Sequence, residues 1–156
     1  MGVLLYDPDT QQVALVEQFR VGVFASDIAV QANTSPWILE PVAGLIDKDE
    51  EPAEVAEREA LEEADAIVQQ LELIGEYYSS PGASNEFFTL FAGKADLSQA
   101  GGIHGLDDEG EDIKVHVFSL DTLWQMLDEH AFNCAHTLIA VQWLQRHHQR
   151  LRTLWS

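Results

Sequence analysis

The chain has 156 residues, a length that fits one folded domain spanning residues 1–156. A hydrophobic fraction of 46%, with four Trp and seven Phe, excludes a disordered acidic chain, while 27 acidic against 8 basic residues argue against binding to nucleic acid or anionic lipid. The single cysteine, Cys134, excludes an intrachain disulfide, and the sequence shows neither a membrane-length apolar run nor a signal-peptide pattern, so we expect a cytoplasmic protein.

Strands and turns are predicted at the start of the chain. Residues 3–6 and 13–19 are rich in apolar residues and flank the turn sequence DPDT at residues 7–10, which predicts a hairpin. Residues 22–35 show weak periodicity and end at a proline, so we expect a loop or a surface excursion there. A further strand is predicted over residues 37–42.

The composition changes to that of a helix between Glu51 and Asp65. Pro52 suits the first helical position, and acidic residues crowd the first turn, where they complement the helix dipole. Small apolar residues at helical spacing predict the buried face of this helix; they are Ala53, Ala56, Ala60, Leu61 and Ala64.

The rest of the chain predicts two strands joined by a turn, then a polar loop, another strand and two helices. The loop is rich in Gly and acidic residues, and Asp121 is the predicted N-cap of the helix that follows the last strand. In chain order these elements are the strands 68–78 and 86–92 around the turn 79–83, the loop 98–112, the strand 113–120, and the helices 121–130 and 135–151.

Three glutamates lie on one face of the predicted helix 51–65. Glu59 and Glu63 are four residues apart, and Glu62 is three from Glu59. Like charges at this spacing cost an exposed helix only ~0.2–0.5 kcal/mol per pair, so a solvated acidic face is one interpretation. The other is that these oxygens hold a hard divalent cation such as Mg²⁺, which would also neutralise a phosphate substrate that the acidic chain otherwise repels.

The wider spacing favours the cation. Gly44 is followed after five residues by Glu50, and after seven more by the run REALEE at residues 58–63. This pattern resembles the Nudix box, the signature of the Nudix hydrolase family. One position departs from the family: Asp65 stands where the box has Gly to end the helix in a left-handed conformation. Asp enters that conformation more readily than most residues, so we expect the turn to survive.

The resemblance implies a fold and a metal site. In the family the box forms a loop-helix-loop motif on a mixed sheet packed between helices, so we expect an α/β protein with an α/β/α sandwich. It implies Mg²⁺ as the cofactor, with Mn²⁺ as the alternative. The implied ligands are Glu59, Glu63, Glu62 as a further candidate, and the backbone carbonyl of Ala43. Arg58 is expected to orient the site, with Glu50 as its ion-pair partner.

Two downstream segments resemble one branch of the family, the bacterial ADP-ribose diphosphatases. The first is the turn Ser80-Pro81-Gly82 followed by Glu86, which could also be an ordinary turn. The second is residues 102–112 (GIHGLDDEGED), similar to the catalytic loop of these enzymes. It implies Glu109 as the general base and Glu111 as another metal ligand; the alternative is a solvated acidic loop.

Other positions also match the family, with packing or turn roles as the alternative. Arg20 and Glu40 are two such positions, and the resemblance implies that Arg20 clamps a phosphate. The implied substrate contacts are Leu45, Ser80, Pro81, Gly82 and Glu86. His136, His147 and His148 lack metal-ligand partners at suitable spacing, so we expect surface or packing roles for them.

The implied reaction is hydrolysis of ADP-ribose to AMP and ribose 5-phosphate. Alternatives are a diphosphatase for another nucleotide-sugar such as GDP-mannose, and a catalytically silent Nudix module that binds a nucleotide or a partner protein. Family members usually begin with a further N-terminal region that builds the dimer and holds the adenine, and that region is expected to be absent here. We therefore expect a homodimer only if this region is present elsewhere.

Overall fold

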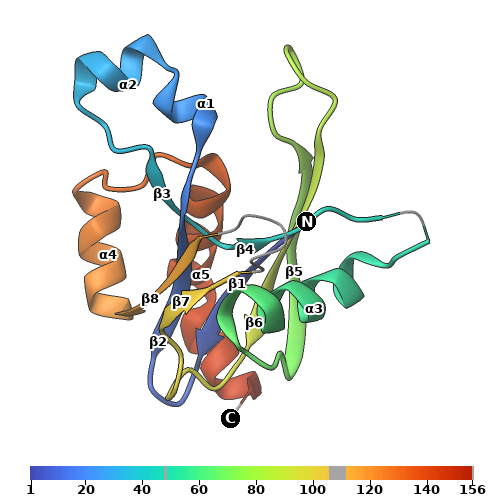
Figure 1. Cartoon of the computed structure of the whole chain (residues 1–156). Coiled ribbons are helices and arrows are strands. Elements are labelled where there is room, and N and C mark those ends of the chain that lie inside the picture. The colour runs from blue at the N-terminus through green and yellow to red at the C-terminus, as the bar shows by residue number, and fades with distance from the viewer. Residues whose placement is uncertain (48, 106–111, 156) are drawn as a thin grey trace.

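A computed structural model describes residues 1–47, 49–105 and 112–155 (Figure 1). Its helices and strands in chain order are β1 (Gly2–Asp7), β2 (Gln12–Phe19), α1 (Val21–Phe24), α2 (Asp27–Ala32), β3 (Trp37–Glu40), β4 (Val42–Ala43), α3 (Pro52–Ala64), β5 (Gln70–Tyr78), β6 (Phe87–Lys94), β7 (Gly102–His104), β8 (Ile113–Ser119), α4 (Leu120–Asp128) and α5 (Ala135–Trp155).

The strands of the described residues form one mixed sheet. Its order is β5-β6-β1-β2-β8-β7, with β3 paired to β2 and β4 paired to β1. β1 and β6 run parallel, and the other pairs are antiparallel. The predicted hairpin at the start of the chain is confirmed, since Leu5 of β1 lies opposite Ala14 of β2.

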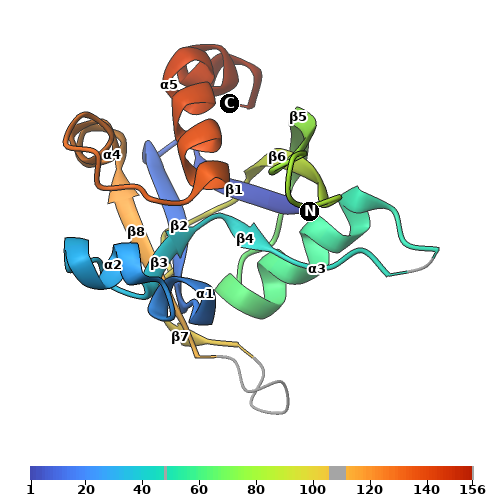
Figure 2. The ribbon, with the colours of Figure 1, turned by 90° about the horizontal axis from the view of Figure 1, so that it is seen from above.

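Helices cover both faces of the sheet, with α3 on one side and α4 and α5 on the other (Figures 1 and 2). The alternation of side chains along β1 explains the two layers. Val3 and Leu5 belong to the core under α3, whereas Leu4 and Tyr6 belong to the core under α5. Because both faces of this central strand are fully buried, the predicted α/β/α sandwich is confirmed.

Helix α3 packs through small residues, which bring its backbone close to the sheet. Ala56, Ala60 and Ala64 are fully buried, as the predicted stripe requires, together with Val55, which the stripe did not include. The prediction that Leu61 belongs to the buried stripe is wrong, because half of the surface of this residue is exposed. The helix ends at Asp65, whose φ of 49° and ψ of 35° are left-handed, so the expected turn is present without glycine.

Several predicted boundaries are corrected by the structure. The segment predicted as a loop over residues 22–35 holds most of the short helix α1, which begins at Val21, and all of α2. Most of the apolar side chains of both helices are exposed, so no buried face gives the sequence a helical pattern. The strand predicted over 37–42 divides at Pro41 into β3 and β4, which pair with different strands, since proline has no N–H for the ladder. The loop predicted over 98–112 includes β7.

The C-terminal part also differs in detail from the prediction. Ser119, rather than Asp121, is the N-cap of α4, because its hydroxyl accepts a hydrogen bond from the backbone N–H of Thr122 at 3.2 Å. Helix α5 continues to Trp155, beyond the predicted end at residue 151. No helix in the described part of the chain combines the length and the apolar character that crossing a membrane requires.

Candidate active site

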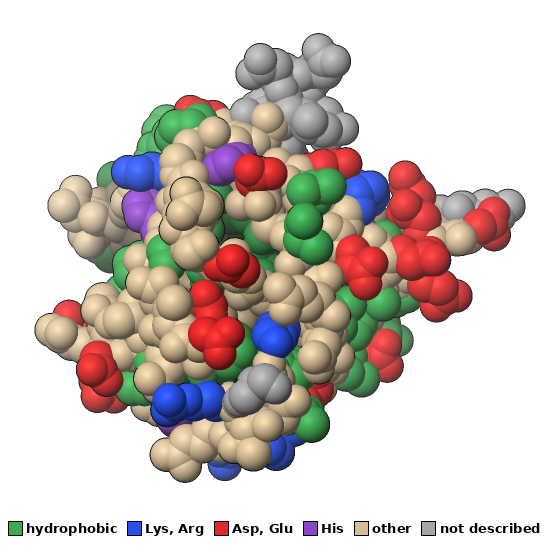
Figure 3. All heavy atoms as spheres, turned by 90° about the horizontal axis from the view of Figure 1, so that it is seen from below, with side chains coloured by type: hydrophobic (Ala, Val, Ile, Leu, Met, Phe, Trp, Pro, Cys, Tyr) green, Lys and Arg blue, Asp and Glu red, His purple; other side chains and the backbone are tan. Residues whose placement is uncertain are grey.

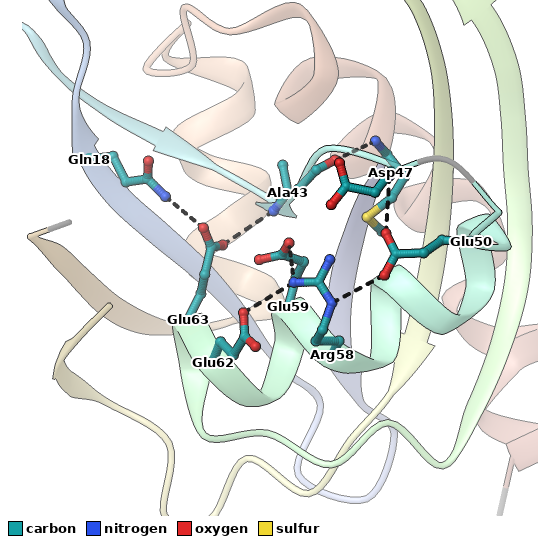
Figure 4. A network of polar contacts seen from close by, with 10 residues as sticks. Gln18, Ala43, Asp47, Glu50, Arg58, Glu59, Glu62 and Glu63 are labelled. Atoms are coloured by element: carbon teal, nitrogen blue, oxygen red, sulfur yellow. Dashed lines mark hydrogen bonds and ion pairs between the residues drawn. The ribbon is translucent and has the colours of Figure 1, made fainter. Parts of the chain in front are cut away.

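Glu63 is a carboxylate buried between α3 and the sheet, with 3% of its surface exposed. Its Oε1 accepts a hydrogen bond from Gln18 Nε2 at 3.1 Å, and its Oε2 accepts one from the backbone N–H of Ala43 at 3.2 Å (Figure 4). A carboxylate taken out of water must be hydrogen-bonded to remain charged. These two donors, from β2 and β4, therefore fix Glu63 at the point where α3 meets the sheet.

Glu59 lies against the backbone of Gly44. A Cβ atom added at residue 44 would overlap the Glu59 carboxylate, so the glycine leaves the space that this side chain fills. The Glu59 side chain is only 14% exposed. The first position of the predicted box is thus a glycine because a side chain there would exclude the Glu59 carboxylate from the space beside the backbone next to Ala43.

Arg58 connects the remaining glutamates of the site. Its Nη1 donates to Glu59 Oε1 at 2.9 Å and to Glu62 Oε2 at 3.2 Å, and its Nε lies 3.7 Å from Glu50 Oε1 (Figure 4). The expected ion pair with Glu50 is therefore present, although the two contacts within α3 are shorter. One guanidinium offsets the repulsion among three carboxylates and orients them.

The oxygens gathered here suit a hard divalent cation in chemical type. Glu59, Glu62, Glu63 and the Ala43 carbonyl supply only oxygen donors, the kind that Mg²⁺ prefers. As the side chains stand, no three acidic, His or Cys groups within the described ranges converge on one point that could hold a metal ion. The other two predicted residues, Glu109 and Glu111, lie outside the residues that the structure describes.

A cleft of about 590 Å³ opens beside Gly44. It brings together three of the six residues predicted to contact substrate, Arg20, Leu45 and Glu86, with Glu40 and the predicted metal ligand Ala43 also in its lining. Arg20 Nε donates to Glu40 Oε2 at 2.6 Å, so the Arg is held by a carboxylate on the cleft wall. The arrangement places a cation and two acidic side chains next to the Ala43–Gly44 backbone.

The segment Ser80-Pro81-Gly82 is not brought to this cleft. It forms the tip of the β5–β6 hairpin, which projects away from the sheet (Figure 1), and Pro81 and Gly82 line a separate hollow of about 430 Å³. The Ser80 carbonyl accepts from the N–H groups of Ala83 and Ser84, at 3.0 and 2.9 Å, as in an ordinary turn. Among the predicted substrate contacts at residues 80–86, only Glu86 lines the cleft.

His136 was expected to have a surface or packing role, but it also lines the cleft. Its ring stacks on Phe88, with centroids 3.7 Å apart and planes at 10°, and its Nδ1 lies 2.8 Å from the Tyr77 hydroxyl. Its partners lie 48 and 59 residues away along the chain, so no local spacing could have revealed this contact. Cys134 also contacts a residue of the cleft wall, because its thiol lies 3.5 Å from Glu40 Oε1.

Comparisons with known proteins agree with this geometry. The model of the NUDIX domain matches residues 1–139. The chain is 40% identical over 154 residues to the ADP-ribose pyrophosphatase of Escherichia coli (strain K12), an alignment that covers 99% of this chain and 71% of the relative. It is 41% identical over 155 residues to the ADP-ribose pyrophosphatase of Haemophilus influenzae, covering 99% and 70%.

A more distant relative is the GDP-mannose pyrophosphatase of Cronobacter sakazakii, 33% identical over 145 residues, which cover 92% of this chain and 72% of the relative. The family match spans the sheet, α3 and the cleft, and the relatives align over nearly the whole chain. The chain therefore belongs to the NUDIX domain family, as the Gly44–Glu63 pattern predicted.

Proposed function

We propose that this protein hydrolyses the diphosphate of ADP-ribose, releasing AMP and ribose 5-phosphate. The observation that carries the substrate is the 40–41% identity, over 99% of the chain, to relatives named ADP-ribose pyrophosphatase. The structure supports the chemistry, because a carboxylate-rich helix and a cleft of about 590 Å³ meet at Ala43 and Gly44. A nucleotide-sugar in the cleft would place its diphosphate beside Glu59.

We propose that the cofactor is Mg²⁺, with Mn²⁺ as the alternative. Glu59, Glu62, Glu63, Glu111 and the Ala43 carbonyl would hold it. When bound, the ion would neutralise phosphoryl oxygens and lower the pKa of a water. The chain's part is to orient the ligands: Gln18 and the Ala43 N–H hold Glu63, and Arg58 holds Glu59 and Glu62.

The other roles in this proposal follow the family resemblance. Glu109 is the general base that takes a proton from the attacking water. Arg20, held by Glu40, binds phosphate oxygen. Leu45 and Glu86, which line the cleft, contact the substrate. The same role for Ser80, Pro81 and Gly82 is carried over from the resemblance alone, since in the described chain this segment lies outside the cleft. We further propose a cytoplasmic location, which the single cysteine supports, and a homodimer for a form of the protein that includes the N-terminal region of its relatives.

A second candidate substrate is GDP-mannose. The similarity to the Cronobacter sakazakii GDP-mannose pyrophosphatase supports it, but at 33% identity that relationship is more distant. Both candidates share the diphosphate and the metal chemistry, and they differ in the base and the sugar.

A panel of nucleotide-sugars with Mg²⁺ distinguishes the candidates. We expect release of AMP from ADP-ribose with kcat/KM at least about tenfold above that for GDP-mannose, and no release when EDTA removes the metal. Greater activity on GDP-mannose would favour the second candidate. Tight binding of ADP-ribose without turnover would contradict both and would favour a catalytically silent module.

A further inference from the structure

Three elements fix the ring of His136 at the wall of the cleft. The residue lies in the first turn of α5, one face of its ring is covered by Phe88 of β6, and its Nδ1 is paired with the hydroxyl of Tyr77 on β5. The ring lines the cleft, and the contacts described here engage Nδ1 and one ring face. Such a fixed, partly buried ring is preorganised for recognition.

The hydroxyl of Tyr77 determines which nitrogen carries the proton. Burial raises the pKa of Tyr77 to about 12, so the hydroxyl keeps its proton at neutral pH. Within the described part of the chain, its recorded hydrogen-bond partner is His136 Nδ1. If Nδ1 carried the proton, the half-buried hydroxyl proton would be left without this acceptor, which is unfavourable. The tautomer that this contact favours therefore has Tyr77 donating to Nδ1 and the ring proton on Nε2.

The ring is also uncharged at neutral pH. Burial lowers the pKa of His136, while the carboxylates of Glu86 and Glu40 act in the opposite direction without reversing the shift. His136 is thus a neutral ring in the lining of a cleft that also holds Glu40, Glu86 and the Met1 ammonium group, the last of which likewise lowers its pKa.

This set of groups favours hydroxyl oxygens over phosphate. The Glu86 carboxylate on the cleft wall would repel a phosphate placed beside it, whereas the charge of Glu40 is offset by Arg20. A sugar hydroxyl, in contrast, can donate to a carboxylate and accept from an N–H at the same time. The diphosphate then lies toward Arg20 and Glu59, and a sugar lies toward Glu86 and His136.

We propose that His136 is a substrate-binding residue, which donates its Nε2–H to a hydroxyl oxygen of the sugar in the nucleotide-sugar, and that Tyr77 positions it. This inference rests on the proposed function for the identity of the ligand. The tautomer of His136 does not depend on that function, so it provides an independent test.

The first experiment observes the tautomer by a long-range ¹H–¹⁵N correlation of the histidine rings in the free protein at pH 7. The signal of residue 136 is the one that His136→Phe removes. We expect the Nε2–H form in the wild type, and a mixture of both forms in Tyr77→Phe. An Nδ1–H form in the wild type would overturn the inference, whether or not the protein hydrolyses ADP-ribose.

The second experiment measures kcat and KM for ADP-ribose hydrolysis with Mg²⁺. Because His136 is neutral, His136→Phe keeps the stacking surface and removes a donor but no charge. We expect KM to rise about tenfold with kcat within about twofold of the wild type, and His136→Gln to restore KM to within about threefold because its amide can donate. The matched control is His147→Phe, on the same helix and stacked on Trp143 instead, which should leave both constants unchanged.

The outcomes separate the two proposals. A folded His136→Phe with unchanged KM, or a His136→Gln no better than His136→Phe, would overturn the role of His136 while the proposed function stands. If the wild type hydrolyses no nucleotide-sugar, the proposed function fails instead. If His136→Phe does not fold, the isosteric Tyr77→Phe replaces it, and unchanged KM in that variant overturns the inference.

Discussion

At the scale of single residues, Gly44 shows most clearly how the fold serves the site. Its missing side chain is the space in which the Glu59 carboxylate lies. The atoms that a Cβ would meet belong to the end of a flexible side chain, which can move at small energetic cost. A substitution at Gly44 should therefore disturb the position of Glu59 more than the stability of the protein.

Gly44→Ala should lower kcat/KM for ADP-ribose by about 100-fold, because a displaced metal ligand loses its geometry. The free energy of unfolding should change by less than about 1 kcal/mol. Steady-state kinetics and urea unfolding measure the two quantities. Gly22→Ala is the control, because a Cβ there meets no atom within 4 Å. Unchanged kinetics in Gly44→Ala would show that Glu59 does not need its present position.

The residues of the box and the ion pair of Arg58 with Glu50 could be predicted because their spacing is local, whereas the partners that other elements supply could not. Helical periodicity alone placed Glu59, Glu62 and Glu63 on one face. Gln18, which donates to Glu63, is 45 residues away in sequence, and the contact exists only because β2 runs beside α3. The same holds for His136, whose position depends on how α5 packs on β5 and β6.

At the scale of elements, α3 ends at Asp65, the position where the Nudix box of the family has glycine. Asp65 caps the helix with φ 49° and ψ 35°, and the backbone N–H groups of Asp65 and Ala66 donate to Leu61 and Ala60, both at 3.0 Å. The closing hydrogen bonds are therefore present. The costs that remain are the left-handed conformation of a residue with a Cβ and a negative charge at the negative end of the helix dipole.

Asp65→Gly should raise the free energy of unfolding by about 0.5–1 kcal/mol, since it removes both costs and adds only the entropy of glycine in the unfolded chain. Asp65→Ala, which keeps a Cβ and removes the charge, should be less stable than Asp65→Gly. Urea unfolding compares the three proteins. A Gly variant less stable than the wild type would mean that the Asp side chain itself stabilises this turn.

The predictability of the elements depended on how regular each pattern was. The β1–β2 hairpin and α3 were predicted correctly because apolar runs, turn residues and helix-start signals agreed. Pro41, which divides residues 37–43 into β3 and β4, is visible in the sequence, but the pairing of the two halves with different strands is not. Helices α1 and α2 were missed since Val21, Phe24, Ile28 and Val30 are exposed, so no buried face marks them.

At the scale of the whole molecule, charge sets the central problem. The chain carries a formal net charge of −19, and Figure 3 shows acidic side chains gathered over the loop that leads into α3. A nucleotide-sugar diphosphate is also an anion, so the overall field opposes its approach. Arg20 is already paired with Glu40. In the proposed site, a cation held by the α3 carboxylates would resolve this conflict where the diphosphate would lie.

The most direct test of the account is the rate of AMP release from ADP-ribose with Mg²⁺ in the wild type, Glu63→Gln and Glu57→Gln. Glu57 lies on the exposed side of α3, so this control removes the same charge from the same helix without touching the site. Thermal unfolding verifies that each variant folds, and Glu59→Gln replaces Glu63→Gln if the buried amide prevents folding.

We expect Glu63→Gln to lose at least about 100-fold in rate, because an amide is a poor substitute for a carboxylate ligand, and Glu57→Gln to remain within about twofold of the wild type. Folded Glu63→Gln with wild-type activity would contradict the assignment of the α3 carboxylates to the metal.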